Sequence, residues 1–133
     1  MIKIRIASEN DFDALSKLYL EMEEEGKYPE YFEEITEDDN KKIIIAEQGK
    51  KIIGLVEIFS EEDSFYINNL IIAQGYRNNG IGSLLINEVK ILAKELEIKK
   101  INITVYQSQK RIEEFYEKNG FKDYSKQMYV EVK

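Results

Sequence analysis

The spacing of apolar residues divides this chain into strand-like and helix-like segments. Runs in which apolar residues alternate with polar ones, or follow one another over a few positions, predict strands. They cover residues 2–6, 43–47, 51–59, 65–72, 101–106, 121–124 and 128–132. Apolar residues three or four positions apart predict helices. These cover residues 12–22 after a capping sequence at 8–11, a short segment ending near Thr36, residues 81–96 and residues 109–118.

The order of these segments predicts a mixed sheet in a single domain. Gln48-Gly49-Lys50 joins two strand-like runs and predicts an antiparallel hairpin. A strand, a helix and a second strand follow one another between residues 65 and 106, which predicts a right-handed crossover between parallel neighbours. With 133 residues and no linker or repeat, we expect one α/β domain over residues 1–133.

The loop from Gln74 to Ser83 joins the apolar strand to the long helix, and its composition suits an anionic ligand. Its glycines let the backbone approach a ligand closely. The free N–H groups of the first helical turn, with the positive end of the helix dipole, attract phosphate. Arg77 adds a permanent positive charge. The loop therefore predicts a site for a pyrophosphate-bearing ligand.

Two common phosphate-binding motifs fit this loop poorly. Gly75 and Gly80 have the spacing of a nucleotide P-loop, but Ile81 stands where that motif has its lysine. Gly80-Ile81-Gly82 begins a dinucleotide fingerprint, but Leu85 replaces the third glycine. The next strand also ends without a ribose-binding acid. An ordinary glycine-rich turn before an amphipathic helix is the remaining alternative to a phosphate site.

Composition excludes several kinds of chemistry. The net charge of −7, from 26 acidic and 19 basic residues, argues against a general nucleic-acid binder and favours cationic partners. Cysteine and histidine are absent, which excludes a thiol nucleophile, disulfides, Ser-His or Cys-His dyads and a Cys/His zinc site. We expect no metal. The start of the chain lacks the apolar core of a signal peptide, and no apolar stretch is long enough to span a bilayer, so we expect a cytoplasmic protein with no membrane partner.

Residues 21–39 are rich in carboxylates and contain one lysine, Lys27. Such a charge run is usually a solvated face. Alternatively, it forms an acidic wall that attracts a protonated amine, in which Tyr28, Tyr31 and Phe32 offer cation–π surfaces. Both interpretations can hold together.

Two motifs resemble those of the GNAT superfamily of N-acetyltransferases. Residues 77–82, Arg-Asn-Asn-Gly-Ile-Gly, resemble its (Q/R)xxGx(G/A) acyl-CoA loop, and residues 115–121, Phe-Tyr-Glu-Lys-Asn-Gly-Phe, are similar to its (L/F)YEKxGF signature. The opening Ile4-Arg5-Ile6-Ala7 also looks like the family's IRxA start. The resemblance implies an α/β fold, α+β by some schemes, with a mixed, mostly antiparallel sheet of about six or seven strands and about four helices.

The resemblance also implies how acetyl-CoA would bind. The loop would hold its pyrophosphate through backbone N–H groups, with help from the Arg77 side chain; these residues are Arg77, Asn78, Asn79, Gly80, Ile81, Gly82 and Ser83. The backbone of Leu70, Ile71 and Ile72 would pair with the pantetheine arm. Gln109 stands where the family has a CoA-binding asparagine and could keep that amide contact.

Catalytic roles follow from the same resemblance. Tyr116 would be the general acid that protonates the departing CoA thiolate, since a phenol with a pKa of about 10 is protonated at neutral pH. Many members have a carboxylate base where this chain has Asn69. We expect Glu57 to be the base instead. A carboxylate between Glu21 and Glu34, or a water held by Asn68 or Asn69, is the alternative.

The resemblance thus implies direct transfer of an acetyl group from acetyl-CoA to a primary amine in a ternary complex. The acceptor would be a small-molecule or peptide amine, and the acidic segment favours a cationic one. The competing hypothesis, suggested by Asn69, is a non-catalytic acyl-CoA-binding module with the same fold. A weaker one is an interaction domain that binds no CoA. We also hypothesise a homodimer through the last strands.

Overall fold

The computed structural model describes residues 1–24, 40–106 and 109–132. Its elements, in chain order, are β1 (Ile2–Ile6), a 3-10 turn (Glu9–Asp11), α1 (Phe12–Glu24), β2 (Lys41–Gln48), β3 (Lys51–Glu61), β4 (Ser64–Ile72), α2 (Ile81–Glu95), β5 (Lys100–Asn102) and α3 (Lys110–Lys118). The predicted helix near Thr36 lies outside the described residues.

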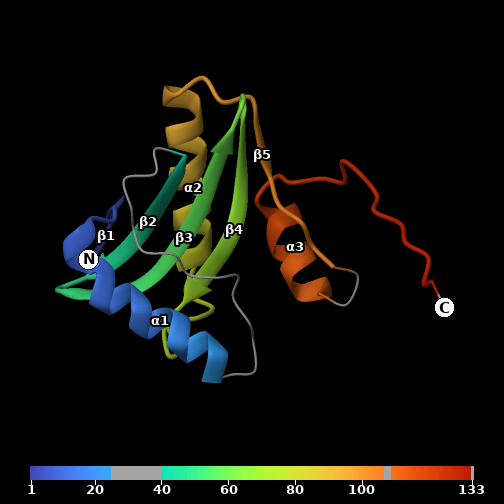
Figure 1. Ribbon diagram of the computed structural model, residues 1–133. Coiled ribbons are helices and arrows are strands. Elements are labelled where there is room, and N and C mark those ends of the chain that lie inside the picture. Colours follow the sequence, from blue (N-terminus) through green and yellow to red (C-terminus); the bar gives the residue numbers. More distant parts are fainter. Residues whose placement is uncertain (25–39, 107–108, 133) are drawn as a thin grey trace.

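The strands form one mixed sheet in the order β1-β2-β3-β4-β5. Neighbours are antiparallel except for β4 and β5, which are parallel and connected through α2. The predicted crossover and the mixed, mostly antiparallel α/β fold are therefore confirmed. Helix α1 covers one face of the sheet and α2 covers the other, while α3 lies beyond β5 (Figure 1).

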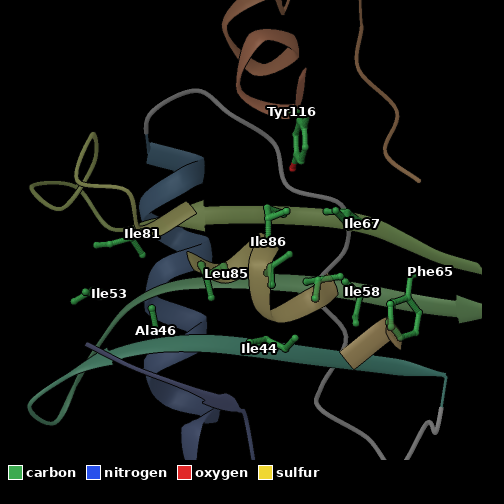
Figure 2. Close-up of a cluster of buried hydrophobic side chains, with 13 residues drawn as sticks. Ile44, Ala46, Ile53, Ile58, Phe65, Ile67, Ile81, Leu85, Ile86 and Tyr116 are labelled. Atoms are coloured by element: carbon green, nitrogen blue, oxygen red, sulfur yellow. The ribbon is translucent and has the colours of Figure 1, made fainter. Parts of the chain in front are cut away.

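Two apolar clusters fill the space between the sheet and its helices. Ile43 and Ile45 of β2 face α1, whereas Ile44 and Ala46 face α2. The α2-side cluster also contains Phe65 and is drawn in Figure 2. Because both faces of the middle strands are covered, β2 and β3 contain nearly continuous apolar runs rather than alternating ones.

The predicted hairpin is present, and Gly54 on β3 marks a close approach of neighbouring elements. Gly49 has φ +64° in the turn between β2 and β3. A Cβ atom on Gly54 would lie 3.0 Å from Ile72 Cδ1 and 3.3 Å from Ile81 Cγ2. The glycine therefore lets the end of β4 and the start of α2 both pack closely against β3.

The prediction of two closing strands at 121–124 and 128–132 is wrong. No strand occurs after β5 in the described part of the chain, and side chains in this region, such as Tyr129 and Val132, are exposed. The alternating pattern supplies β propensity, but the segment has no hydrogen-bonded ladder partner, and β5 itself pairs only over Lys100–Asn102. The described residues thus contain five strands, three α-helices and a 3-10 turn. Among these helices, none has the length and apolarity needed to cross a bilayer.

A charged cluster ties the start of the chain to the sheet. Both terminal guanidinium nitrogens of Arg5 donate to the Asp11 carboxylate at 2.8 Å, and Nη2 also donates to Glu47 at 2.8 Å. The backbone N–H of Ser8 donates to Asp11 at 2.8 Å, as expected for a capped helix start. The hydrogen bonds from Arg5, above all, hold the pKa of Asp11 below its ordinary value.

We expect Asp11→Asn to lower the free energy of unfolding by about 1 to 2 kcal/mol at pH 7. Because the folded state depresses the pKa of Asp11, this stabilisation is present above the unfolded pKa of about 3.9 and is lost as the pH falls through the folded pKa. Urea unfolding at pH 7 and at pH 3 would measure the difference. Asp13→Asn, the same substitution at an exposed position two residues further along, is the matched control. If both substitutions lowered the free energy of unfolding equally, the stabilising role given to the Asp11 hydrogen bonds would be wrong.

Candidate active site

The loop between β4 and α2 has the backbone geometry of an anion-binding turn. Gly75, Asn78 and Gly80 have positive φ angles of 91°, 64° and 79°. Gly80 caps α2, and no side chain among the described residues caps the helix start. The first intrahelical bond runs from the Leu84 N–H to the Gly80 carbonyl at 3.1 Å. The N–H groups of the first turn are therefore left for a ligand.

Arg77 is held at the mouth of this loop. Its Nε donates to the Ile72 carbonyl at 3.0 Å, which fixes the guanidinium beside the end of β4. The loop is also anchored to α1, since Glu21 accepts a hydrogen bond from the Gln74 N–H at 2.7 Å. Glu21 was among the alternative bases, and its carboxylate supports the loop in this structure.

Gly82 has a packing role that the sequence did not reveal. A Cβ atom there would lie 3.1 Å from Phe115 Cζ, so the glycine lets α3 pack against the first turn of α2. Asn119, at the end of α3, strengthens this contact by donating to Ser83 Oγ at 3.3 Å. By contrast, a Cβ on Gly75 or Gly80 would meet nothing within 4 Å. Those two glycines serve the backbone conformation of the loop.

Strand β4 has an open side beyond its short pairing with β5. The parallel pairing stops at Tyr66 and Asn102. Beyond a bulge, β4 is in register with β3, and Ala73 N–H donates to the Ile53 carbonyl. In an antiparallel ladder, alternate residues direct their backbone groups to opposite sides.

It follows that Ile71 bonds to β3, whereas Leu70 and Ile72 direct their backbone N–H and C=O groups to the open side. The Ile72 carbonyl is already bonded to Arg77. The groups left for a ligand are the Leu70 N–H and C=O and the Ile72 N–H. Of the three residues predicted to pair with pantetheine, the structure thus leaves two in position to do so.

Tyr116 of α3 lies across this open side. The residue is 4% exposed, and its ring makes edge contacts with Phe115 and Phe121 at centroid distances of 5.0 and 5.2 Å. Figure 2 shows the hydroxyl end directed toward β4. Burial raises the pKa of Tyr116 above its ordinary value, so the phenol stays protonated at neutral pH.

The Tyr116 hydroxyl is available to a ligand. No hydrogen bond joins it to another described residue, and no buried side-chain nitrogen or oxygen in the described part of the chain lacks a partner. The hydroxyl oxygen is therefore reached by solvent, although the ring is enclosed.

Glu57 of β3 is 3% exposed and lies on the α1 face of the sheet. Its Oε1 pairs with Lys41 Nζ at 2.8 Å. Its Oε2 accepts hydrogen bonds from Tyr19 at 2.7 Å and from Asn69 Nδ2 at 2.8 Å. Burial, with the adjacent Glu57 charge, raises the pKa of Tyr19, which therefore remains a donor. Lys41 and Tyr19 were missed because neither is near Glu57 in the sequence.

The remaining predicted site residues either bond within their own turns or lie outside the described residues. The Gln109 side chain accepts a hydrogen bond from the Tyr106 N–H at 3.1 Å, so it is engaged in its own turn. Asn79 donates to the Tyr76 carbonyl at 3.4 Å within the loop. The predicted amine-binding aromatics Tyr28, Tyr31 and Phe32 lie outside the described residues. Within residues 1–24, 40–106 and 109–132, no three acidic side chains gather as a metal-binding group.

Comparisons with known proteins identify the fold and family. A model of the acetyltransferase (GNAT) domain matches residues 15–131. The structure is similar to an aminoglycoside acetyltransferase, meta-AAC0020, from an uncultured soil metagenomic sample, in complex with sisomicin, with 19% identity over 99% of this chain and 97% of that chain and a TM-score of 0.78.

Two further solved structures share this fold. PaiA N-acetyltransferase from Thermoplasma acidophilum, in complex with coenzyme A, has 22% identity over 92% of this chain and 90% of its own, with a TM-score of 0.77. AAC(6')-Iy, in complex with the bisubstrate analogue CoA-S-monomethyl-acetylneamine, has 12% identity over 100% and 99%, with a TM-score of 0.80. These likenesses show the shared fold, and the domain match spans most of the chain. The protein is therefore a member of the GNAT acetyltransferase family.

Proposed function

We propose that this protein transfers an acetyl group from acetyl-CoA to a primary amine. The observation that carries the proposal is the open side of β4, which leads directly into the anion-binding turn. There, backbone groups of Leu70 and Ile72 have no partner strand among the described residues. Pantetheine contains amide groups that can pair with a strand edge as an added strand does. Its pyrophosphate would then meet Arg77 and the first-turn N–H groups of α2.

Transfer would proceed by direct attack. The amine nitrogen forms a bond to the thioester carbonyl carbon, the carbon–sulfur bond breaks, and the Tyr116 phenol protonates the departing thiolate. The amine loses its proton to Glu57 through a water, because the carboxylate is too buried for direct contact. Holding both substrates together would supply much of the acceleration, about 7 to 11 kcal/mol in favourable cases.

The acceptor we propose is a cationic primary amine, of a small molecule or a peptide. The net charge of −7 and the carboxylates between residues 21 and 39 favour such a partner. Two of the solved structures with this fold hold an aminoglycoside or an aminoglycoside-derived analogue.

A non-catalytic acyl-CoA-binding module is the second candidate. It is favoured by the amide at Asn69 and by the three hydrogen-bonded or ionic partners that already occupy Glu57. Such a module would bind acetyl-CoA but release no CoA with any amine, so turnover separates the two functions.

Thermal unfolding with matched concentrations of acetyl-CoA, CoA, ATP and NAD tests the ligand. A ligand at about 100 times its Kd stabilises the fold by about 2.7 kcal/mol, which raises Tm by several degrees for a domain of this size. We expect acetyl-CoA and CoA to raise Tm, and ATP and NAD to leave it unchanged. If a folded sample showed no shift with acetyl-CoA, the proposed function would be wrong.

A further inference from the structure

A polar cluster is buried on the α1 face of the sheet, at the middle of β4. It consists of Lys41, Glu57 and Asn69 from three adjacent strands and Tyr19 from α1, with the distances given above. All four side chains are largely enclosed. Asn69 directly precedes Leu70, whose backbone faces the open side of β4.

The charge on Glu57 determines how the Asn69 amide is turned. Lys41 and Glu57 form an ion pair at 2.8 Å, so the carboxylate is ionised. An ionised carboxylate only accepts hydrogen bonds, and an amide can meet it only with its NH₂ group. Asn69 therefore donates through Nδ2 to Glu57, and its Oδ1 lies on the side of the amide away from that bond.

The Asn69 Oδ1 atom is an acceptor without a donor among the described residues. No hydrogen bond reaches it from the described part of the chain, and within that part no fully buried polar side-chain atom lacks a partner. The oxygen is therefore in contact with solvent, although the residue is only 8% exposed. Asn69 Oδ1 is thus an acceptor in contact with solvent, in the residue next to Leu70 on the strand proposed to bind the pantetheine arm.

We propose that Asn69 Oδ1 binds the attacking amine, and that Glu57 and Lys41 are positioning residues that fix its direction. This inference rests on the proposed function and assigns its acceptor site. An N–H of the amine donates to Oδ1, which leaves the nitrogen lone pair to point at the thioester carbonyl. A neutral amide oxygen suits this task because, unlike a carboxylate, it does not stabilise the amine in its unreactive protonated form.

NMR of the protein with bound CoA tests the contact without requiring turnover. Sisomicin, spermidine and a peptide with a free lysine side chain serve as primary-amine probes. We expect at least one to shift the Asn69 carboxamide signals. Asn69→Leu, which keeps the branched shape and removes the acceptor, should weaken binding of that amine about ten-fold and change the Kd of acetyl-CoA by less than two-fold.

Two further variants separate amine binding from mere structural support. Tyr19→Phe removes the other donor to the same Glu57 oxygen, so it should lower Tm as Asn69→Leu does while leaving amine affinity within two-fold of wild type. In Glu57→Gln, the new side-chain NH₂ group can donate to Asn69 Oδ1, which lets the Asn69 carboxamide rotate by 180°. This variant should therefore weaken amine binding as Asn69→Leu does. Equal amine affinities in Asn69→Leu and wild type, or equal losses in Asn69→Leu and Tyr19→Phe, would overturn the inference.

Two outcomes distinguish failure of the inference about Asn69 from failure of the proposed function. If acetyl-CoA stabilises the protein but no amine of the panel shifts the Asn69 signals, the inference about Asn69 is wrong and acyl-CoA binding stands. If acetyl-CoA gives no stabilisation, the proposed function is wrong. In that case an amine that still shifted Asn69 would mark an amine site unrelated to acetyl transfer, which would also overturn the inference.

Discussion

Tyr116→Phe should lower kcat at least ten-fold and leave the Kd of acetyl-CoA nearly unchanged. The substitution removes one oxygen and keeps the ring, which packs in the α2-side cluster and makes edge contacts with Phe115 and Phe121. Because the hydroxyl has no hydrogen bond to another described residue, its loss leaves no described donor or acceptor unpaired. The effect should therefore fall on the transition state, where the thiolate develops charge, and not on folding or ground-state binding.

The pH dependence provides a second check on Tyr116. Burial raises the pKa of this phenol, so it stays protonated well above neutral pH and should not limit activity below about pH 10. Any loss of activity between pH 5 and 8 would then come from the amine or from its proton acceptor. Free CoA thiol can be measured without background, since the protein contains no cysteine.

Tyr66→Phe is the matched control for this experiment. Tyr66 is the last residue of β4 that pairs with β5, and it is 40% exposed. The same chemical change there should leave kcat within two-fold of wild type. A wild-type kcat in Tyr116→Phe would refute the assignment of the acid, and equal losses in both variants would point to a general effect on packing.

The parts of the site that are local in sequence could be predicted. The apolar run of β4, the glycines of the loop and the spacing of α2 are each determined by neighbouring residues, and the structure has all three. The crossover followed from the order of these elements. Helix α3 was expected from Gln109 to Lys118 and begins at Lys110, with Gln109 as its cap.

Features that depend on partners distant in the sequence could not be predicted. Lys41 and Tyr19 meet Glu57 only because β2, β3 and α1 pack together, and no local pattern marks those pairs. The prediction of closing strands was wrong for the same reason, because β propensity at residues 128–132 does not supply a ladder partner. Gly82 was assigned to ligand approach alone, and its contact with Phe115 required the position of α3.

The position of Gly82 also decides which variant can test the phosphate site. Any side chain at Gly82 would press on the Phe115 ring, 3.1 Å from the Cβ position, and overpacking typically costs about 1 to 3 kcal/mol. Loss of acetyl-CoA binding in such a variant would not distinguish a blocked site from a displaced α3. Arg77 is the better target, since its side chain can be changed without filling a packed space.

Arg77→Glu should raise the Kd of acetyl-CoA about 100-fold. Hydrogen bonds between a charged donor and a phosphate contribute about 1.5 to 3 kcal/mol, and the new carboxylate would also repel the pyrophosphate. The hydrogen bond from Arg77 Nε to the Ile72 carbonyl holds the guanidinium where it can reach a ligand on the open side of β4. The Arg77 side chain therefore loses little conformational entropy when the ligand binds. Arg77→Gln, which removes the charge without reversing it, should raise Kd about ten-fold.

Lys94→Glu is the control that separates a local contact from overall charge. It makes the same change as Arg77→Glu, taking the net charge from −7 to −9, since one positive charge becomes negative. Lys94 is in the last turn of α2, about 20 Å from the loop along the helix, and screening acts over about 8 Å at physiological salt. Calorimetric titration with acetyl-CoA should therefore give a wild-type Kd for Lys94→Glu. Similar affinities of Arg77→Glu and Lys94→Glu would show that the loop does not bind the pyrophosphate.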